Sequence, residues 1–202
     1  MMLSTAVPTG SFKRMDLRAI PDRPKKLSAT TIRASLEGVL LRELTHADLP
    51  RLVELNNKNV PAVSPSDETG MAALLAATDT TVAVVAADDP HTVLGFALLM
   101  RAGAAYDSEN YRWFEARGSQ FYYVDRIVVA DEAQNSGIGS ALYAAVFDAA
   151  RARGLSEVTC EVNVEPPNPG SMRFHERLGF TEVGRQSTKG GTIVVALLAA
   201  AV

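Results

Sequence analysis

The amino-acid sequence predicts an α/β domain built around a mixed β-sheet. Short runs of β-branched and aromatic residues alternate with stretches whose apolar residues recur at helical spacing. Residues 121–129 are the run most typical of a strand, and they lead through a turn with two glycines into a predicted helix. The resulting order, β-α-α-β-β-β-α-β-α-β-β, is that of an α/β domain.

The first half of the domain contains two predicted helices and a hairpin. Thr45 is a candidate N-cap, and the residues after it carry an apolar stripe at helical spacing. Ser66 is a candidate cap for a second helix. A linker rich in turn residues, Asp88-Asp89-Pro90-His91, joins two strand-like runs. The predicted elements are a strand at 39–44, helices after Thr45 and Ser66, and strands at 81–86 and 93–100, followed by a long connection at 101–119.

The second half alternates strands with helices. The strand predicted at 157–164 places Cys160 on one face, whereas Thr159, Glu161 and Asn163 share the other face. Cys160 is expected to be a buried thiol rather than a nucleophile. The predicted elements are a strand at 121–129, a helix at 140–153, a strand at 157–164, a helix at 171–178, and strands at 181–184 and 192–198.

Composition and charge exclude several classes of function. The chain has 202 residues and a formal net charge of -3, so it lacks the net positive charge typical of proteins that bind nucleic acid or an anionic membrane. No apolar run approaches the roughly 20 residues that span a bilayer. One cysteine and three widely separated histidines offer no disulfide framework and no spacing typical of a metal site. We therefore expect a cytoplasmic protein without a metal.

The first thirty residues differ from the rest of the chain. They are basic, contain prolines and lack sustained periodicity. A weak transit peptide or a nucleic-acid-binding arm is one interpretation, but a flexible, dispensable N-terminal extension fits this composition better. We expect residues 1–30 to be such an extension and residues 38–198 to form the folded domain.

The turn after residues 121–129 has the chemistry of a phosphate-binding loop. Gly137 and Gly139 allow backbone N–H groups to approach a ligand, and the following helix N-terminus contributes unpaired N–H groups and a partial positive charge. No Gly-Lys-Ser/Thr sequence ends the turn, so it is not a Walker A loop. Leu142 replaces the third glycine of the dinucleotide-binding pattern.

Two sequence motifs, one in the glycine turn and one after the next predicted strand, narrow the interpretation of this phosphate-binding loop. Gln134, Gly137 and Gly139 match a Q/R-x-x-G-x-G/A pattern. After the next predicted strand, residues 168–180 match N-x-x-A/S-x-x-F/L-Y-x-x-x-G-F, with histidine in place of the tyrosine. On these motifs, residues 38–198 resemble the GNAT superfamily of N-acetyltransferases.

The resemblance implies a mixed central sheet that is splayed between its fourth and fifth strands and flanked by helices. It also implies acetyl-CoA as co-substrate and a small-molecule or peptide amine as acceptor, which attacks the thioester directly. Family members are often dimers, so a homodimer is possible. The expected cofactor-binding residues are Ile127, Val128 and Val129 along the strand, Gln134, Asn135, Ser136, Gly137, Ile138, Gly139 and Ser140 in the loop, and Asn168 on the far wall.

The catalytic residues are less well defined by the resemblance. His175 occupies the position of the family's tyrosine acid, where it either protonates the leaving thiolate or only packs on its helix. Asp125 precedes the cofactor strand and is a candidate base acting through a water, with a structural contact to Arg126 as the alternative. If neither group is catalytic, the domain is a non-catalytic acyl-CoA-binding or sensor module on the same fold.

Aromatic residues point to the acceptor site. The connection at 101–119 is long enough to suggest a function, and we expect its C-terminal half to lie near the chemistry. Trp113 and Tyr123 are the candidate acceptor contacts, because aromatic rings suit a charged amine. The alternative for Trp113 is that it anchors a short helix, at 107–116, onto the core.

Overall fold

The computed structural model describes residues 38–202. The predicted extension at residues 1–30 lies outside the described residues, so its dispensability stays a prediction.

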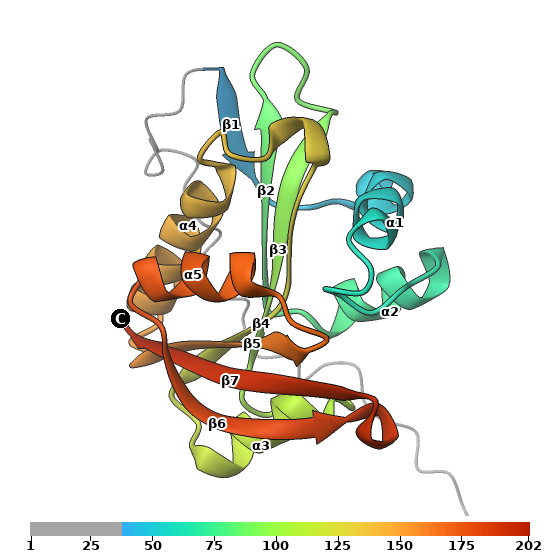
Figure 1. Ribbon diagram of the computed structural model, residues 1–202. Coiled ribbons are helices and arrows are strands. Elements are labelled where there is room, and N and C mark those ends of the chain that lie inside the picture. The colour runs from blue at the N-terminus through green and yellow to red at the C-terminus, as the bar shows by residue number, and fades with distance from the viewer. Residues whose placement is uncertain (1–37) are drawn as a thin grey trace, which may run out of the picture.

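The described residues form one seven-stranded sheet with the strand order β1-β2-β3-β4-β5-β7-β6 (Figure 1). The hairpin predicted from the Asp88-to-His91 turn is confirmed as the antiparallel pair β2–β3. The strands are β1 (Val39–Arg42), β2 (Thr80–Ala86), β3 (Val93–Arg101), β4 (Phe121–Val129), β5 (Glu157–Glu165), β6 (Thr181–Thr188) and β7 (Ile193–Ala201).

The sheet separates between its fourth and fifth strands. β4 and β5 run parallel, and their register extends only from the pair Phe121 and Glu157 to the pair Tyr123 and Thr159. Beyond Tyr123, β4 continues beside β3 whereas β5 continues beside β7. The predicted splay is thereby confirmed, and it leaves a wedge-shaped gap at the carboxyl ends of both strands.

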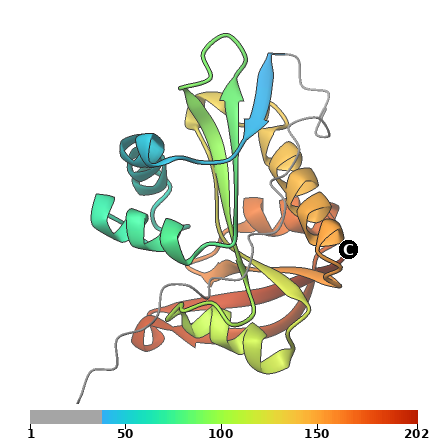
Figure 2. The same cartoon turned by 180° about the vertical axis from the view of Figure 1, so that it is seen from behind.

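Helices cover both faces of the sheet. α4 packs against β2, β3 and β4, while α1 lies on the opposite side against β3 and β4, an arrangement visible in Figures 1 and 2. α3 contacts β4 and β6 at the other end of the molecule. The helices are α1 (Leu49–Lys58), α2 (Glu68–Ala77), α3 (Glu109–Arg117), α4 (Ile138–Ala152) and α5 (Pro169–Arg177), with single 3-10 turns at His46–Asp48, Asp131–Ala133 and Lys189–Gly191.

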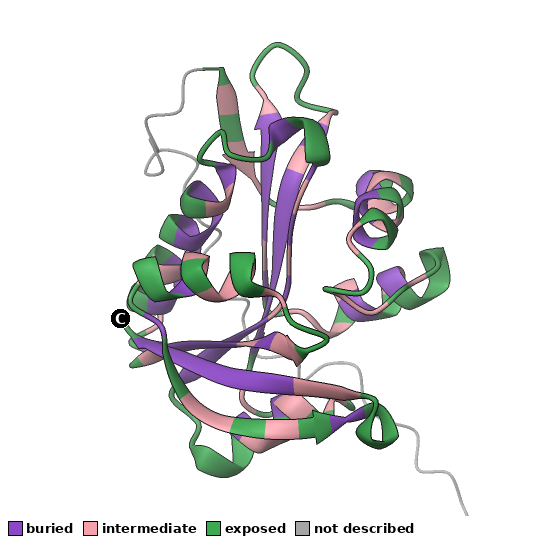
Figure 3. Cartoon of the chain, in the orientation of Figure 1, coloured by how far each residue is buried: buried purple, intermediate pink, exposed green. Residues whose placement is uncertain are grey.

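The buried core follows the centre of the sheet and the inner face of α4 (Figure 3). Leu142 and Val146 on α4 are fully buried, as their helical spacing predicts. α4 begins at Ile138, two residues before the predicted start, because Gly137 forms its N-cap in the left-handed region. α5 likewise begins at Pro169, since proline is well suited to the first helical position.

Candidate active site

The edge of β4 that faces the gap offers unpaired backbone groups. Ala130 N donates to Leu94 O at 2.8 Å, so Ala130 pairs with the β3 side. Because backbone direction alternates along a strand, Val128 also faces β3, whereas the N–H groups of Ile127 and Val129 face the gap. The prediction for Ile127 and Val129 agrees with this geometry. The backbone of Val128 pairs with β3 and its side chain is buried, so this geometry does not support its predicted contact with the cofactor.

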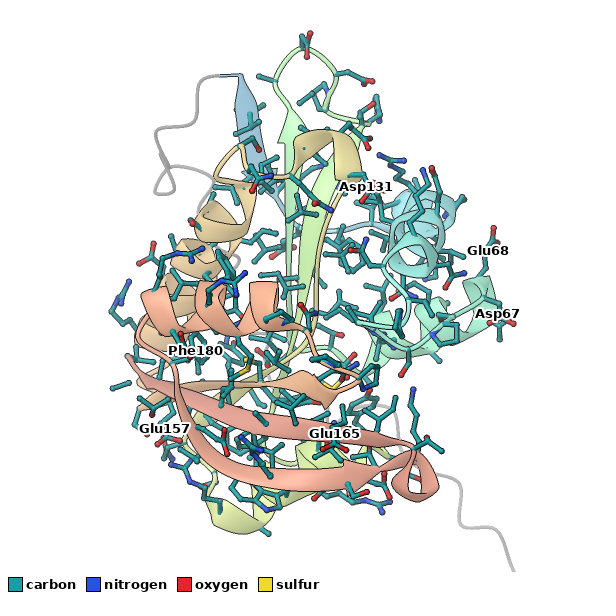
Figure 4. All side chains as sticks on the ribbon, viewed as in Figure 1. Asp67, Glu68, Asp131, Glu157, Glu165 and Phe180 are labelled. Atoms are coloured by element: carbon teal, nitrogen blue, oxygen red, sulfur yellow. The ribbon has the colours of Figure 1, made fainter. Side chains whose placement is uncertain are left out.

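The glycine turn is an exposed loop between β4 and α4. Asn135 and Gly137 have φ angles of 60° and 88°, so two residues of this short loop are left-handed. The Gln134 side chain donates to Asp131 Oδ1 at 2.9 Å, and Ser136 Oγ donates to Ala133 O at 2.5 Å. Figure 4 labels Asp131, which marks the point where β4 enters the loop. These side chains hold the loop, whose residues 135–137 are exposed beside the N-terminus of α4.

Two loop residues have a packing role that the motif does not reveal. A Cβ added at Gly139 would lie 3.1 Å from the Phe174 ring, so the second glycine also allows α4 and α5 to approach. The Ile138 side chain is buried. Ile138 and Gly139 can therefore contact a ligand through their backbone alone, while Ser140 exposes its side chain as well.

Asn168 lies on the far wall of the gap as the N-cap of α5. Its Oδ1 accepts from Ser171 N at 3.1 Å. The side-chain Nδ2 makes no hydrogen bond within residues 38–202, and Asn168 lines a pocket that opens from the gap. The cap thus fixes the amide so that its donor remains free for a ligand.

The pocket, of about 460 Å³, continues the gap into the protein. Its walls come from segments that are distant in sequence: the α1–α2 loop, the residues before and at the start of α3, β4, α4, β5, α5, the end of β6 with the turn after it, and β7. Residues 106–110 line the pocket, whereas residues 111–119 do not. The prediction that the C-terminal half of the 101–119 connection lies near the chemistry was wrong, because that half is the body of α3.

A β-bulge directs two consecutive side chains of β4 to the pocket. Leu98 pairs with Arg126 and Leu99 with Val124, so Asp125 is the extra residue. Both Asp125 and Arg126 line the pocket. Burial raises the pKa of the Asp125 carboxyl, although Arg126 and the hydroxyl of Tyr106 act to lower it.

Asp125 is already engaged on two sides. The Tyr106 hydroxyl donates to its Oδ1, and Arg126 Nε lies 3.1 Å from its Oδ2. The structural contact to Arg126, the alternative to a catalytic role, is therefore present.

Glu161 is a pocket residue that the sequence motifs did not predict. It lines the pocket from β5, and its Oε2 accepts from the Tyr123 hydroxyl at 2.7 Å. Burial, with a further contribution from the nearby Asp125, raises the pKa of this carboxyl to about 7. A carboxylate with such a pKa is a competent base near neutral pH. The polar alternation of Thr159, Glu161 and Asn163 was the one signal in the sequence.

His175 lies at the other end of the pocket and is buried. Its Nδ1 lies 2.8 Å from Ser171 O, which can only accept, so Nδ1 carries the proton. The Nε2 atom then accepts from the hydroxyl of Tyr143, 2.7 Å away. Burial lowers the pKa of the ring, which favours neutral imidazole over imidazolium. Tyr143, on α4, also lines the pocket and was not anticipated.

The two residues predicted to contact the acceptor, Trp113 and Tyr123, do not line the pocket. A Cβ added at Gly184 would lie 2.6 Å from Trp113 Cζ2, so the indole packs tightly on β6. This geometry supports the anchoring alternative, and the acceptor contact of Trp113 stays a prediction. Tyr123 is fully buried and reaches the pocket only through its bond to Glu161. Cys160 is buried as expected, and burial raises the pKa of its thiol.

Most of the domain that carries this site matches one family of known proteins. The sequence profile of the family described as "Acetyltransferase (GNAT) family" matches residues 49–180. The chain belongs to the GNAT acetyltransferase family. GNAT acetyltransferases transfer an acyl group and use acetyl-CoA as co-substrate, so this chain is an acyltransferase of that family.

Among curated GNAT relatives, the chain is similar to phosphinothricin N-acetyltransferase of Streptomyces coelicolor. The two are 43% identical over 58 residues, which is 29% of this chain. The matched segment spans only 33% of that relative.

Solved structures share the GNAT fold at low sequence identity. Ard1 of Thermoplasma volcanium has a TM-score of 0.65 at 15% identity, over 82% of this chain and 98% of its own. The ribosomal-protein-S18-alanine N-acetyltransferase of Escherichia coli has a TM-score of 0.60 at 18% identity, over 81% and 93%. The yncA protein of Salmonella typhimurium was solved with its cofactor acetyl-CoA. It has a TM-score of 0.60 at 18% identity, over 81% of this chain and 93% of its own. Within residues 38–202, no helix has the length and apolar character needed to cross a membrane.

Proposed function

We propose that this GNAT protein transfers the acetyl group of acetyl-CoA to the primary amine of a small acceptor. The observation that supports this most strongly is the position of Glu161. A carboxylate with a pKa of about 7 lines a pocket that opens from the gap between β4 and β5. This position supports Glu161 as the base for an amine that enters the pocket.

The gap has the groups that acetyl-CoA requires. Residues 135–137 are exposed, and their N–H groups together with those of the α4 N-terminus suit a pyrophosphate. The N–H groups of Ile127 and Val129 can donate to amide carbonyls placed along the strand edge, and Asn168 Nδ2 is a further donor on a residue that lines the pocket. Acetyl-CoA, when bound, supplies the acetyl thioester.

Glu161 is the proposed base. An amine is protonated near neutral pH and must lose its proton before it attacks. Glu161 accepts this proton, directly or through a water, and Tyr123 holds the carboxylate in place through its hydrogen bond of 2.7 Å. Asp125, predicted as the base from sequence, is committed to Tyr106 and Arg126. We assign it the role of raising the pKa of Glu161.

The departing sulfur receives its proton at the other end of the pocket. Tyr143 Oη and His175 Nε2 share one proton over 2.7 Å, and both residues line the pocket. We propose that this shared proton is the one presented to the sulfur. A hydroxyl is thus supplied from α4, although the tyrosine expected at position 175 is absent. A backbone N–H group of this strand edge that the amides of the ligand leave free supplies a fixed donor for the developing oxyanion.

A thiol-release assay tests the proposal. Purified protein is incubated with acetyl-CoA and a panel of amines, amino acids, polyamines and peptides, and free thiol is measured. Amine-dependent release that Glu161→Gln reduces strongly is the expected result. Absence of release with every amine, in a protein that binds acetyl-CoA, would instead support the acyl-CoA-binding module.

The cytoplasmic location and the homodimer stay predictions. The curated relative acetylates phosphinothricin, as its name states, and this similarity favours a small-molecule acceptor over a large one.

A further inference from the structure

A primary amine of the protein itself lies at the rim of the pocket. Residues 38–202 contain two lysines, Lys58 and Lys189, of which only Lys189 lines the pocket. Lys189 is exposed in the turn between β6 and β7, and its Nζ donates to Ser64 Oγ at 2.9 Å. Ser64 belongs to the α1–α2 loop and also lines the pocket. The lysine side chain therefore reaches from one segment of the pocket wall to another and ends in an amine.

The backbone of the turn fixes the place of this amine. Lys189 has a φ angle of 51°, a left-handed conformation that glycine adopts at lower cost. Its backbone N donates to Glu109 Oε2 at 3.3 Å, and Thr192 Oγ1 donates to its carbonyl at 2.9 Å. Contacts on both sides thus hold a lysine where glycine would fit better. Residues held in such a conformation cluster at functional sites.

The charge of Lys189 has no anionic partner in the described chain. Its Nζ donates to a neutral hydroxyl, and no carboxylate of residues 38–202 forms an ion pair with it. The carbonyl of the same Ser64 accepts from Arg126 Nη1 at 2.8 Å, so two cations meet at one residue. Acetylation of Lys189 would remove one of these charges and break no ion pair. Lys58 differs, because its Nζ pairs with Glu54 Oε1 at 2.7 Å.

Resting on the proposed function, we propose that Lys189 is a self-acetylation site, at which the protein transfers the acetyl group of acetyl-CoA to its own Nζ. Lys189 and Glu161, the proposed base, line the same pocket. The flexible four-carbon stem of lysine lets Nζ leave Ser64 and turn into this pocket. An amine tethered beside the reacting group has a high effective concentration, so it needs none of the affinity that a free acceptor requires.

The transfer balances with the groups already described. The Nζ ammonium loses one proton to Glu161, and the neutral amine attacks the acetyl carbon. The amide bond forms, and the sulfur leaves with the electron pair of the C–S bond. The sulfur takes the proton shared by Tyr143 and His175, and the second proton lost from the nitrogen replaces it. One proton is released in total, from Glu161 to the solvent.

The direct test incubates the purified full chain with acetyl-CoA and no added amine. Intact mass measures the acetyl groups per chain, and peptide mapping assigns each group to a residue. Lys189 should be acetylated at least about 10-fold faster than Lys58, the advantage of a tethered amine beside a base. Lys58 is the internal control, because it is exposed and is not part of the pocket. Equal rates at the two lysines, or no acetyl group on Lys189, would overturn the proposal.

Variants connect the modification to the pocket. Glu161→Gln should slow acetylation of Lys189 by about 10²-fold, because the base is lost, and leave the slow reaction of Lys58 unchanged. Glu157→Gln, on the same strand and paired with Arg117, is the matched control and should acetylate Lys189 at the wild-type rate. A folded Glu161→Gln protein that acetylates Lys189 at the full rate would reveal uncatalysed chemistry and contradict self-acetylation.

A dilution series distinguishes transfer within one chain from transfer between chains. The rate per chain should stay constant as the protein is diluted at constant acetyl-CoA. A mixture gives a second test, because Glu161→Gln keeps Lys189 without the base and Lys189→Arg keeps the base without the lysine. Lys189 in the mixture should be acetylated no faster than in Glu161→Gln alone. A rate that falls on dilution, or fast acetylation in the mixture, would instead make a second chain the acceptor and overturn the proposal.

The same samples separate this proposal from the proposed function. Amine-dependent thiol release with Lys189 unmodified would overturn the self-acetylation site and leave the acetyltransferase in place. Acetylated Lys189 without thiol release by any added amine would support the self-acetylation site and contradict a free small acceptor. Neither reaction, in a protein that binds acetyl-CoA by calorimetry, would contradict both.

Discussion

The hydroxyl of Tyr143 lies 2.7 Å from Nε2 of His175, and the two rings meet edge to face at 5.3 Å. Tyr143 comes from α4 and His175 from α5, so the contact joins two helices at the wall of the pocket. Because Nδ1 donates to Ser171 O, the imidazole is fixed in one tautomer. The two side chains therefore hold one proton between them and should respond to substitution as a single unit.

Loss of either ring of this pair should lower turnover. His175→Phe and Tyr143→Phe are each expected to reduce kcat by about 10²-fold, with the affinity for acetyl-CoA little changed, because proton delivery is lost. The double variant should be no slower than the slower single variant, since both changes break one interaction. His175→Tyr should recover part of the rate.

Tyr111→Phe is the matched control for this pair. It removes another buried hydroxyl, which donates to Arg101 O at 2.7 Å and is not part of the pocket. It should lower the melting temperature without changing kcat. Unchanged turnover in His175→Phe would show that the pair is structural.

Activity should depend on the ionisation of Glu161. The base acts in its deprotonated form, so kcat/KM is expected to rise with pH and to level off above about 7, the pKa of this carboxyl. Glu161→Gln should lower kcat/KM by about 10²-fold or more and remove this ionisation from the profile. Glu157→Gln, on the same strand and paired with Arg117, is the control. An unaltered profile in Glu161→Gln would exclude this residue as the base.

Ionisation of Glu161, which should raise activity, should lower the stability of the folded protein. The pKa of Glu161 is higher in the folded protein than its ordinary value of 4.5, so the folded state binds its proton more tightly. The stabilisation is complete below pH 4.5 and is lost as pH rises to about 7. Thermal denaturation should therefore show Glu161→Gln gaining stability relative to the wild-type protein between about pH 5 and pH 8. A constant difference would contradict the raised pKa.

A charge in the glycine loop should prevent cofactor binding. Gly137 has φ 88°, so Gly137→Glu and Gly137→Gln impose the same backbone strain and differ only in charge. If phosphate oxygens bind this loop, calorimetry should show acetyl-CoA binding at least about 10-fold weaker to the Glu variant than to the Gln variant. Equal affinities in two folded variants would place the pyrophosphate elsewhere.

Trp113 should contribute to stability and not to acceptor binding. Its indole packs on the backbone of Gly184, and the ring meets Phe114 edge to face at 5.1 Å. Trp113→Ala should destabilise the protein by about 2 kcal/mol, below the usual cost for a fully buried tryptophan because the residue is half-buried. The KM values for acceptor and acetyl-CoA should not change. A selective rise in the acceptor KM would restore the prediction made from sequence.

The fold was largely predictable because its signals are local. The bounds of β4 were predicted correctly, since its aromatic and β-branched residues end at a turn. Helix starts were shifted by about two residues where the cap is Gly137 or where proline begins the helix. The splay came from the resemblance and not from residue patterns, because no local pattern shows where two parallel strands stop pairing.

From the sequence, the site could be predicted only in the part where backbone groups are expected to bind the ligand. The loop and the gap-facing N–H groups of β4 follow from short motifs, whereas the chemistry of the pocket depends on long-range packing. Glu161 was visible as a polar position on β5, but only the tertiary structure shows that this face borders Asp125 and the pocket. In the sequence, Tyr143 cannot be distinguished from the other core residues of α4. Its contact with His175 joins residues 32 positions apart, so only the tertiary structure shows it.

The short pairing of β4 with β5 has a mechanical consequence. Strands β1 to β4 form one antiparallel unit and β5 to β7 another, and in the described chain three residue pairs join their backbones. A ligand whose amides form hydrogen bonds with Ile127 and Val129 would add interactions across the gap. It would act as a reversible cross-link between the two units. The two units should then move relative to each other about Tyr123 with a larger amplitude in the free protein than in the ligand-bound protein. Ligand binding can therefore be followed through slower hydrogen exchange of the amides of residues 127 and 129.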